Sequence, residues 1–79
     1  LTVALQALAV TISDDNRARR LLELNGLSPD DLRSRATHRE VLAAVLGFLE
    51  AHEPDLLTVA EALGRKPEEL VSARSALEA

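Results

Sequence analysis

Apolar residues recur three and four positions apart along most of this 79-residue chain, and this spacing limits the possible folds more than any other feature. Leu1, Leu5, Leu8 and Ile12 follow the period of one side of a helix. Tyr and Trp are absent, Phe occurs once, and β-branched residues never alternate with polar ones as they do in strands. The pattern predicts an all-α fold.

Helix start and stop signals divide the first half of the chain into three segments. The first helix is expected over residues 1–12, and the second follows a polar stretch in which Asp14 or Asp15 can cap it. That second helix should close at Gly26. Ser28-Pro29-Asp30-Asp31 combines an N-cap, a proline and two acids, so it predicts a short third helix to about residue 35.

The second half of the chain carries similar signals. Thr37-His38-Arg39-Glu40 has the pattern of another capping box and predicts a fourth helix through about His52. Pro54 is expected to begin a fifth helix that closes at Gly64, and Pro67 to begin a sixth. We therefore expect one domain over residues 1–79, built as a compact bundle of five to six short helices.

The two halves of the chain align when one is shifted by 38 positions. Gly26 then matches Gly64, and Pro29 matches Pro67. One interpretation is a duplicated three-helix unit with half-repeats 1–36 and 37–79; the other is that shared capping chemistry makes any two such segments look alike. Because Lys66 stands where the first half has the Ser28 cap, the last helix should be the more loosely anchored one.

Three segments together resemble a known family, and the likeness covers nearly all 79 residues. They are residues 4–9 (Ala-Leu-Gln-Ala-Leu-Ala), residues 26–33 (Gly-Leu-Ser-Pro-Asp-Asp-Leu-Arg) and residues 41–49 (Val-Leu-Ala-Ala-Val-Leu-Gly-Phe-Leu). The family comprises short alphaproteobacterial proteins classed as a domain of unknown function, number 3572. The resemblance implies a small helical bacterial protein of the cytoplasm, and it brings no activity, substrate or catalytic residue.

The reactive side chains do not form a recognisable catalytic or metal site. The chain has no cysteine, which excludes disulfides and thiolate metal sites, and its three glycines are isolated, unlike a phosphate-binding loop. His38 and His52 would lie at opposite ends of one helix, about 21 Å apart at 1.5 Å per residue, too far to share an ion. We expect no enzyme, no cofactor and no metal.

Charge is unevenly distributed. The chain carries a net charge of -4, yet residues 17–39 contain six arginines against three acidic residues. This basic cluster comprises Arg17, Arg19, Arg20, Arg33, Arg35 and Arg39. It could contact phosphates as an accessory nucleic-acid binder, or it could be a solvated face paired with nearby acids. The low pI of 5.0 and the near absence of aromatics favour the second interpretation.

Apolar content suggests a protein-binding role. Apolar residues make up 47% of a chain too small to hide them all, so part of the first helix or of the region around Phe48 is expected to stay exposed. The candidate interaction surface is Leu1, Leu5, Leu8 and Phe48. Our leading expectation is a protein-interaction module that binds an unknown protein or its own copy; the alternative is nucleic-acid binding by the basic cluster.

Overall fold

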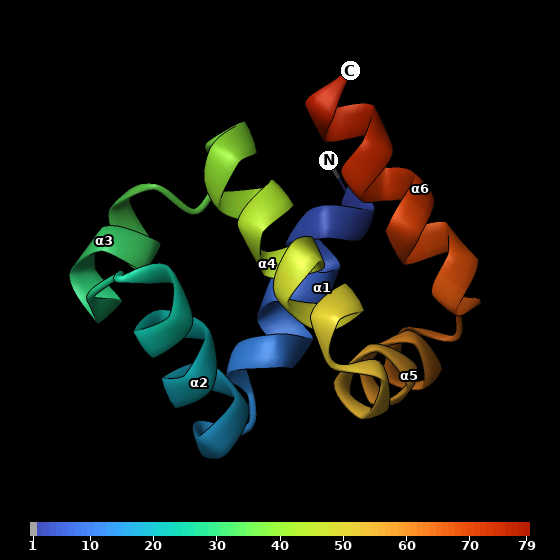
Figure 1. Ribbon diagram of the computed structural model, residues 1–79, viewed down its shortest axis with the longest axis horizontal. Helices are drawn as coiled ribbons and strands as arrows, with labels where there is room; N and C mark the ends of the chain where they lie inside the picture. The colour runs from blue at the N-terminus through green and yellow to red at the C-terminus, as the bar shows by residue number, and fades with distance from the viewer. Residues whose placement is uncertain (1) are drawn as a thin grey trace.

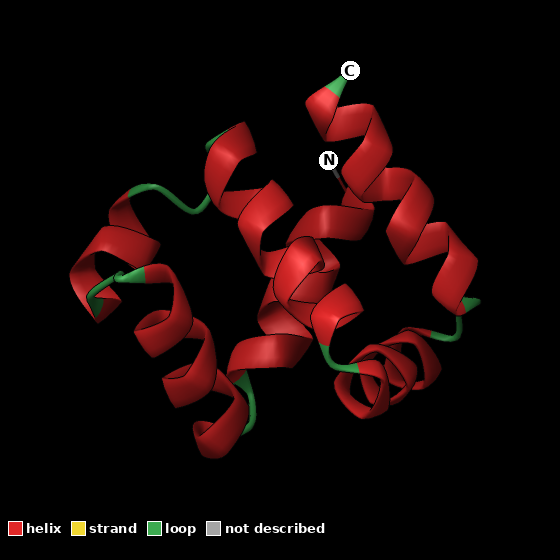
Figure 2. Cartoon of the chain, in the orientation of Figure 1, coloured by secondary structure: helices red, strands yellow, loops and turns green. Residues whose placement is uncertain are grey.

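The protein was analysed as a computed structural model that describes residues 2–79, and six helices joined by short turns fill that range (Figures 1 and 2). They are α1 (Thr2–Ile12), α2 (Asp15–Asn25), α3 (Pro29–Ser34), α4 (Arg39–Ala51), α5 (Glu53–Leu63) and α6 (Pro67–Glu78). No strand occurs in the described range. The predicted all-α bundle of five to six short helices is confirmed.

Two helices form the centre of the molecule. Figure 1 shows α1 passing behind α4, and the two contact each other extensively. The most extensive helix pair is α4 with α6, while α5 packs mainly on α1. The buried apolar residues form one cluster, whose largest fully buried members are Leu21, Leu42, Leu46, Leu49 and Leu70. The apolar stripes of α1 and α4 therefore meet in a shared core.

The molecule is a flat slab, with extents of 29 × 28 × 18 Å. The thin dimension separates the side of α4 seen in Figure 1 from the side of α1 behind it. Over residues 2–79, none of the helices combines the length and the apolar character needed to cross a membrane.

The first three helix boundaries agree with the capping chemistry. The Asp14 carboxylate accepts hydrogen bonds from the backbone N–H groups of Asn16 (2.8 Å) and Arg17 (3.1 Å) and caps α2. Gly26 closes α2 with a φ of 63°. At the start of α3, the backbone N–H of Asp31 donates to Ser28 Oγ (3.0 Å) and that of Ser28 donates to the Asp31 carboxylate (3.1 Å), which completes the capping box.

The start of α4 differs from the prediction. His38 occupies the N-cap position and makes no side-chain hydrogen bond there, while Thr37 lies in the preceding turn. The reason is that the chain continues to turn after α3: the backbone N–H of His38 donates to the Arg35 carbonyl at 3.0 Å. Glu40 is consequently placed for an ion pair with Arg35 (3.6 Å) instead of a capping box.

The helix bounds repeat at the expected offset, but the packing does not. Shifting α2 by 38 positions gives the bounds of α5, and the same shift carries Pro29 at the start of α3 to Pro67 at the start of α6. However, α6 is twice as long as α3 and lies along α4, whereas α3 makes few contacts with other helices. Similar capping signals thus begin α3 and α6, although the two helices pack in different environments.

The expectation that the last helix is loosely anchored is wrong. Leu70 of α6 is fully buried in the core. Lys66 also retains half of a capping box, because its backbone N–H donates to the Glu69 carboxylate at 2.7 Å. Burial of the apolar side of α6 outweighs the loss of a serine cap, and α3 is the less anchored of the two helices.

Candidate functional site

An apolar groove of about 460 Å³ lies among α1, α2 and α3. Its walls are apolar except for one charged residue, Arg33 at the rim, whose guanidinium pairs with Asp30 at 3.1 Å. The lining residues are Leu8, Ile12, Ala18, Leu22, Pro29, Leu32, Arg33 and Ala36. A concave surface of this composition can accept apolar side chains from another helix.

The sequence builds this groove through three local devices. The Asp14 cap begins α2 immediately after α1 ends, so the two helices form a corner with Ile12 on its inner side. The Ser28 capping box then begins α3, which returns the chain over α2. Leu32 is the one residue of α3 that becomes buried, and it forms the far wall of the groove.

The outer side of α1 extends this apolar surface. Leu5 and Ile12 are 38% and 42% exposed, and they lie seven residues apart on the same side of the helix. Ala9 lies between them and is also exposed. No residue of α1 carries a charge. We call Leu5, Ala9, Ile12 and the groove together the α1 surface.

The structure corrects the predicted interaction residues. Leu5 is exposed, but Leu8 is only 6% exposed and Phe48 only 7% exposed, so neither forms an open face. Leu8 reaches the floor of the groove, while Phe48 packs into the core cluster from α4. Leu1 lies outside the described residues. The helical period alone could not distinguish a side chain facing the core from one facing solvent along the same stripe.

Sequence reasoning missed the groove walls contributed by α2 and α3. Leu22, Leu32 and Ala36 line the groove, and none of them is a candidate interaction residue in the sequence analysis. A partial signal exists, because the Ser28-Pro29 start fixes where α3 begins and therefore where Leu32 falls. The position of α3 opposite α1 across the groove, however, is a tertiary feature that no local motif encodes.

The basic cluster does not form a single exposed surface. Arg17 is buried, and its guanidinium donates hydrogen bonds to the carbonyls of Thr11 (3.3 Å) and Val10 (2.8 Å) at the end of α1. Arg20 forms an ion pair with Asp55 (2.9 Å) and lies over the Phe48 ring at 5.7 Å from its centroid. These two arginines hold helices together, although only Arg17 is buried and the Arg20 side chain is 41% exposed.

The remaining four arginines are scattered. Arg33 pairs with Asp30 and Arg35 with Glu40, both near the protein surface. In the described part of the chain, no acidic group lies within ion-pair distance of Arg19 or Arg39. Arg19 is on α2 and Arg39 begins α4, so the unpaired cations belong to different elements.

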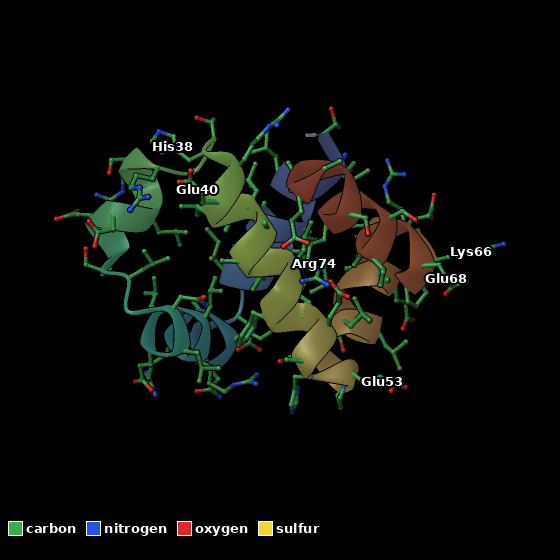
Figure 3. The ribbon with its side chains drawn as sticks, turned by 45° about the horizontal axis from the view of Figure 1, so that its top comes forward. His38, Glu40, Glu53, Lys66, Glu68 and Arg74 are labelled. Carbon is green, nitrogen blue, oxygen red and sulfur yellow. The ribbon has the colours of Figure 1, made fainter. Side chains whose placement is uncertain are left out.

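A second groove, of about 770 Å³, lies between α4 and α6. Arg74 projects from α6 into this region (Figure 3), where it forms ion pairs with Glu50 and Glu78. Its rim carries charges of both signs from Arg39, Glu40 and Glu78. Arg74 is therefore occupied by protein acids, and the groove has neither the apolar lining nor the net charge that would select one class of ligand.

Titratable groups outside these grooves serve helix ends. A hydrogen bond from the Arg17 backbone N–H lowers the pKa of Asp14, and one from the Ser28 backbone N–H lowers the pKa of Asp31. His52 Nδ1 lies 3.0 Å from the Asp55 carboxylate, where α4 ends and α5 begins. Within residues 2–79, no three metal-binding side chains gather closely enough to hold an ion.

Comparison with known proteins adds the family. No curated protein and no solved structure matches the chain. A family described as "Protein of unknown function (DUF3572)" matches residues 1–79, the whole of the sequence. The chain therefore belongs to this family of proteins of unknown function.

Proposed function

We propose that this protein is a small non-enzymatic interaction module whose α1 surface binds the apolar side of a partner helix. The observation that carries the proposal is the α1 surface itself: an apolar groove beside a helix that has no charged residue and exposes Leu5 and Ile12. Depletion of charge with retained apolar side chains is typical of the buried centre of a protein interface.

Covering this surface with a partner contributes a modest favourable free energy of binding. Full burial of a leucine or isoleucine side chain is worth about 1.5–3 kcal/mol, and Leu5 and Ile12 are each somewhat over half buried already. Covering both therefore contributes roughly 1 kcal/mol apiece. The groove walls add further contacts, so a partner helix with two or three apolar residues at helical spacing fits the surface.

The cellular setting is part of the proposal. The resemblance to short alphaproteobacterial proteins supports a bacterial protein that works in the cytoplasm. We therefore propose that the partner is also a cytoplasmic protein.

Nucleic-acid binding is the competing function. Two of the six arginines of the basic cluster, Arg17 and Arg20, are engaged within the fold, which weakens this alternative. If it nevertheless applied, affinity for DNA or RNA would fall steeply as salt rises and would drop when Arg19 and Arg39 become alanine. Such a result would replace the interaction module with the alternative.

Photo-crosslinking in living cells tests the interaction module. A photoreactive amino acid is placed at Ile12 and, in a separate variant, at Leu24, which is more exposed (75%) but lies on the other side of α2 from the groove. We expect a discrete protein adduct from position 12 and none from position 24. Equal adduct patterns at both positions, or no protein adduct at position 12, would contradict the proposal.

A further inference from the structure

We propose that the helix bound by the α1 surface is α1 of a second copy of this chain, antiparallel to the first and related to it by a two-fold axis between Leu8 and Ala9. This inference rests on the proposed function and specifies its partner. The three observations that support it are the charge distribution, the spacing of the exposed residues and the isolation of the other exposed apolar side chains.

Charge favours contact through α1. The chain carries a net charge of -4, so two copies repel one another over most approaches. Helices α2 to α6 each carry at least three charged residues, whereas α1 carries none. Two copies that meet through α1 bring no like charges into the centre of the contact, and they need not strip water from any ion.

The spacing of exposed residues on α1 is self-complementary. Leu5 and Ile12 are seven residues and about 10.5 Å apart, so they fall on one side of the helix at equal distances from the point midway between Leu8 and Ala9. In an antiparallel pair about that point, Leu5 lies opposite the partner's Ile12, and each contact occurs twice, as a two-fold interface requires. The small Ala9 side chains permit the helix axes to approach to about 8 Å.

Other exposed apolar residues do not offer such a pattern. Leu24 is the most exposed of them, but it stands two residues from Leu22, about 160° around α2 from the groove, with Glu23 and Asn25 on either side. Leu57 and Val71 lie on different helices, α5 and α6. Single exposed apolar residues are normal on protein surfaces. Among the helices of residues 2–79, α1 alone combines two exposed large apolar residues with an absence of charge.

The expected dimer is weak. Two helices of eleven residues cover less than the roughly 1,200 Å² of a standard stable interface, so we expect a Kd of about 10 µM to 1 mM. Exchange between monomer and dimer should accordingly be fast.

Sedimentation equilibrium tests the dimer directly. At about 2 mM, the weight-average mass of the wild-type chain should be at least about 1.6 times its 8.5 kDa monomer mass. Ile12→Glu should remain monomeric, because it places one carboxylate against the apolar Leu5 of the other copy at each of the two contacts. Leu24→Glu should dimerise like the wild type. A wild-type monomer at the highest concentration, or a monomer produced equally by Leu24→Glu, would overturn the inference.

Disulfide trapping tests the antiparallel arrangement without disturbing the apolar residues. The chain has no cysteine, so a single Ala9→Cys substitution gives one thiol per copy. The proposed axis brings the two Ala9 Cα atoms to within about 7 Å, the limit for a disulfide, so mild oxidation at about 100 µM should yield a covalent dimer. Leu24→Cys serves as the control. Equal yields from both variants would refute the arrangement.

The two proposals can fail separately. If the wild-type chain is monomeric in sedimentation but Ile12 still crosslinks to a different protein in cells, the second copy is the wrong partner and the interaction module stands. If both the sedimentation and the crosslinking experiments are negative, the interaction module itself is wrong.

Discussion

Arg17 shows how much a single side chain can do in a protein with so small a core. Its buried guanidinium donates to the carbonyls of Val10 and Thr11 in the last turn of α1. The Val10 carbonyl also accepts from the Ser13 backbone N–H (3.2 Å) and Oγ (2.6 Å). A positive charge at this position also complements the negative end of the helix dipole. The arginine thereby fixes the corner between α1 and α2, on whose inner side the groove lies.

Replacing Arg17 by methionine should destabilise the protein by about 1.5–3 kcal/mol. The Thr11 carbonyl loses its charged donor, whereas the Val10 carbonyl keeps its hydrogen bonds from Ser13 and the apolar stem is retained. Urea unfolding followed by circular dichroism measures the change. Arg19→Met is the matched control: Arg19 is exposed, and its replacement should change stability by less than about 0.5 kcal/mol. Equal losses for the two variants would contradict the structural role of Arg17.

Acid should destabilise the protein through two helix caps. The folded protein lowers the pKa of Asp14 and Asp31 below the usual 3.8, so their ionised forms contribute stability above that pH. That contribution is lost as the pH falls through the lowered values. The double variant Asp14→Asn/Asp31→Asn should therefore lose less stability than the wild type between about pH 5 and pH 3. Denaturant titrations at several pH values give the free energy of unfolding as a function of pH for each protein. If the two dependences were parallel, the Asp14 and Asp31 caps would not be a source of the acid sensitivity.

At the residue scale, cap residues were predictable from sequence and buried charges were not. Asp14, Ser28 and Asp31 form hydrogen bonds to residues at most three positions away in the chain, so their roles can be predicted from the local sequence. Arg17 and Arg20 act on groups in other elements, and the sequence shows six arginines without indicating which two turn inward.

At the scale of elements, glycine has opposite roles at two positions. Gly26 ends α2 with a φ of 63°, a conformation that side chains disfavour. Gly47 lies within α4, where an added methyl group would sit 3.8 Å from Arg74 Nη1 and 3.9 Å from its Cδ, which is ordinary van der Waals contact.

Substituting alanine at the two glycines should therefore give changes of opposite sign. Gly26→Ala should cost about 1–2 kcal/mol because it imposes a left-handed conformation on a residue with a side chain. Gly47→Ala should stabilise by about 0.5–1 kcal/mol because it removes the flexibility that glycine gives the unfolded chain. Thermal unfolding of both variants provides the measurement, and a destabilised Gly47→Ala would show that the Arg74 side chain cannot adjust.

The elements themselves were largely predictable because their start and stop signals are local. Pro29, Pro67, Gly26 and Gly64 mark boundaries that the structure confirms. The start of α4 was predicted wrongly because the turn after α3 continues to His38, and hydrogen bonds decide where such a turn stops. The different lengths of α3 and α6 depend on whether a neighbouring helix is available for packing, which the two similar starts do not reveal.

At the scale of the whole molecule, an ion pair links α2 to the second half of the chain. Arg20 of α2 pairs with the mostly buried Asp55 of α5 at 2.9 Å, and His52 contacts the same carboxylate at the junction of α4 and α5. Few other contacts join α2 to the second half. This pair therefore helps to hold α2, and with it one wall of the groove, together with the Arg17 hydrogen bonds and the buried Leu21.

A double-mutant cycle on Arg20→Gln and Asp55→Asn should reveal a coupling energy of about 1–2 kcal/mol, because the carboxylate is largely removed from water. The exposed pair of Arg33 with Asp30 has a similar distance, 3.1 Å, and serves as the control, with no measurable coupling expected. Equal coupling energies from the two cycles would show that burial of Asp55 does not strengthen its ion pair with Arg20.

The α1 surface was only partly predictable because its two parts have different origins. Leu5 and Ile12 belong to one helix, and their shared side follows from the helical period, although their exposure does not. The groove needs three helices placed in space, and its residues are separated by up to 28 positions in the chain. The sequence predicts an apolar contact surface, but it does not show which residues of α2 and α3 line the groove.

The thinness of the slab has a consequence for anyone seeking to inhibit the protein. The described helices form only two layers across the 18 Å dimension, those of α4 and α1, and the apolar core fills the space between them, so the grooves are open to solvent on one side. Any inhibitor would keep one side in water and would need a large contact area on the protein surface, as a stapled peptide or a miniature antibody has.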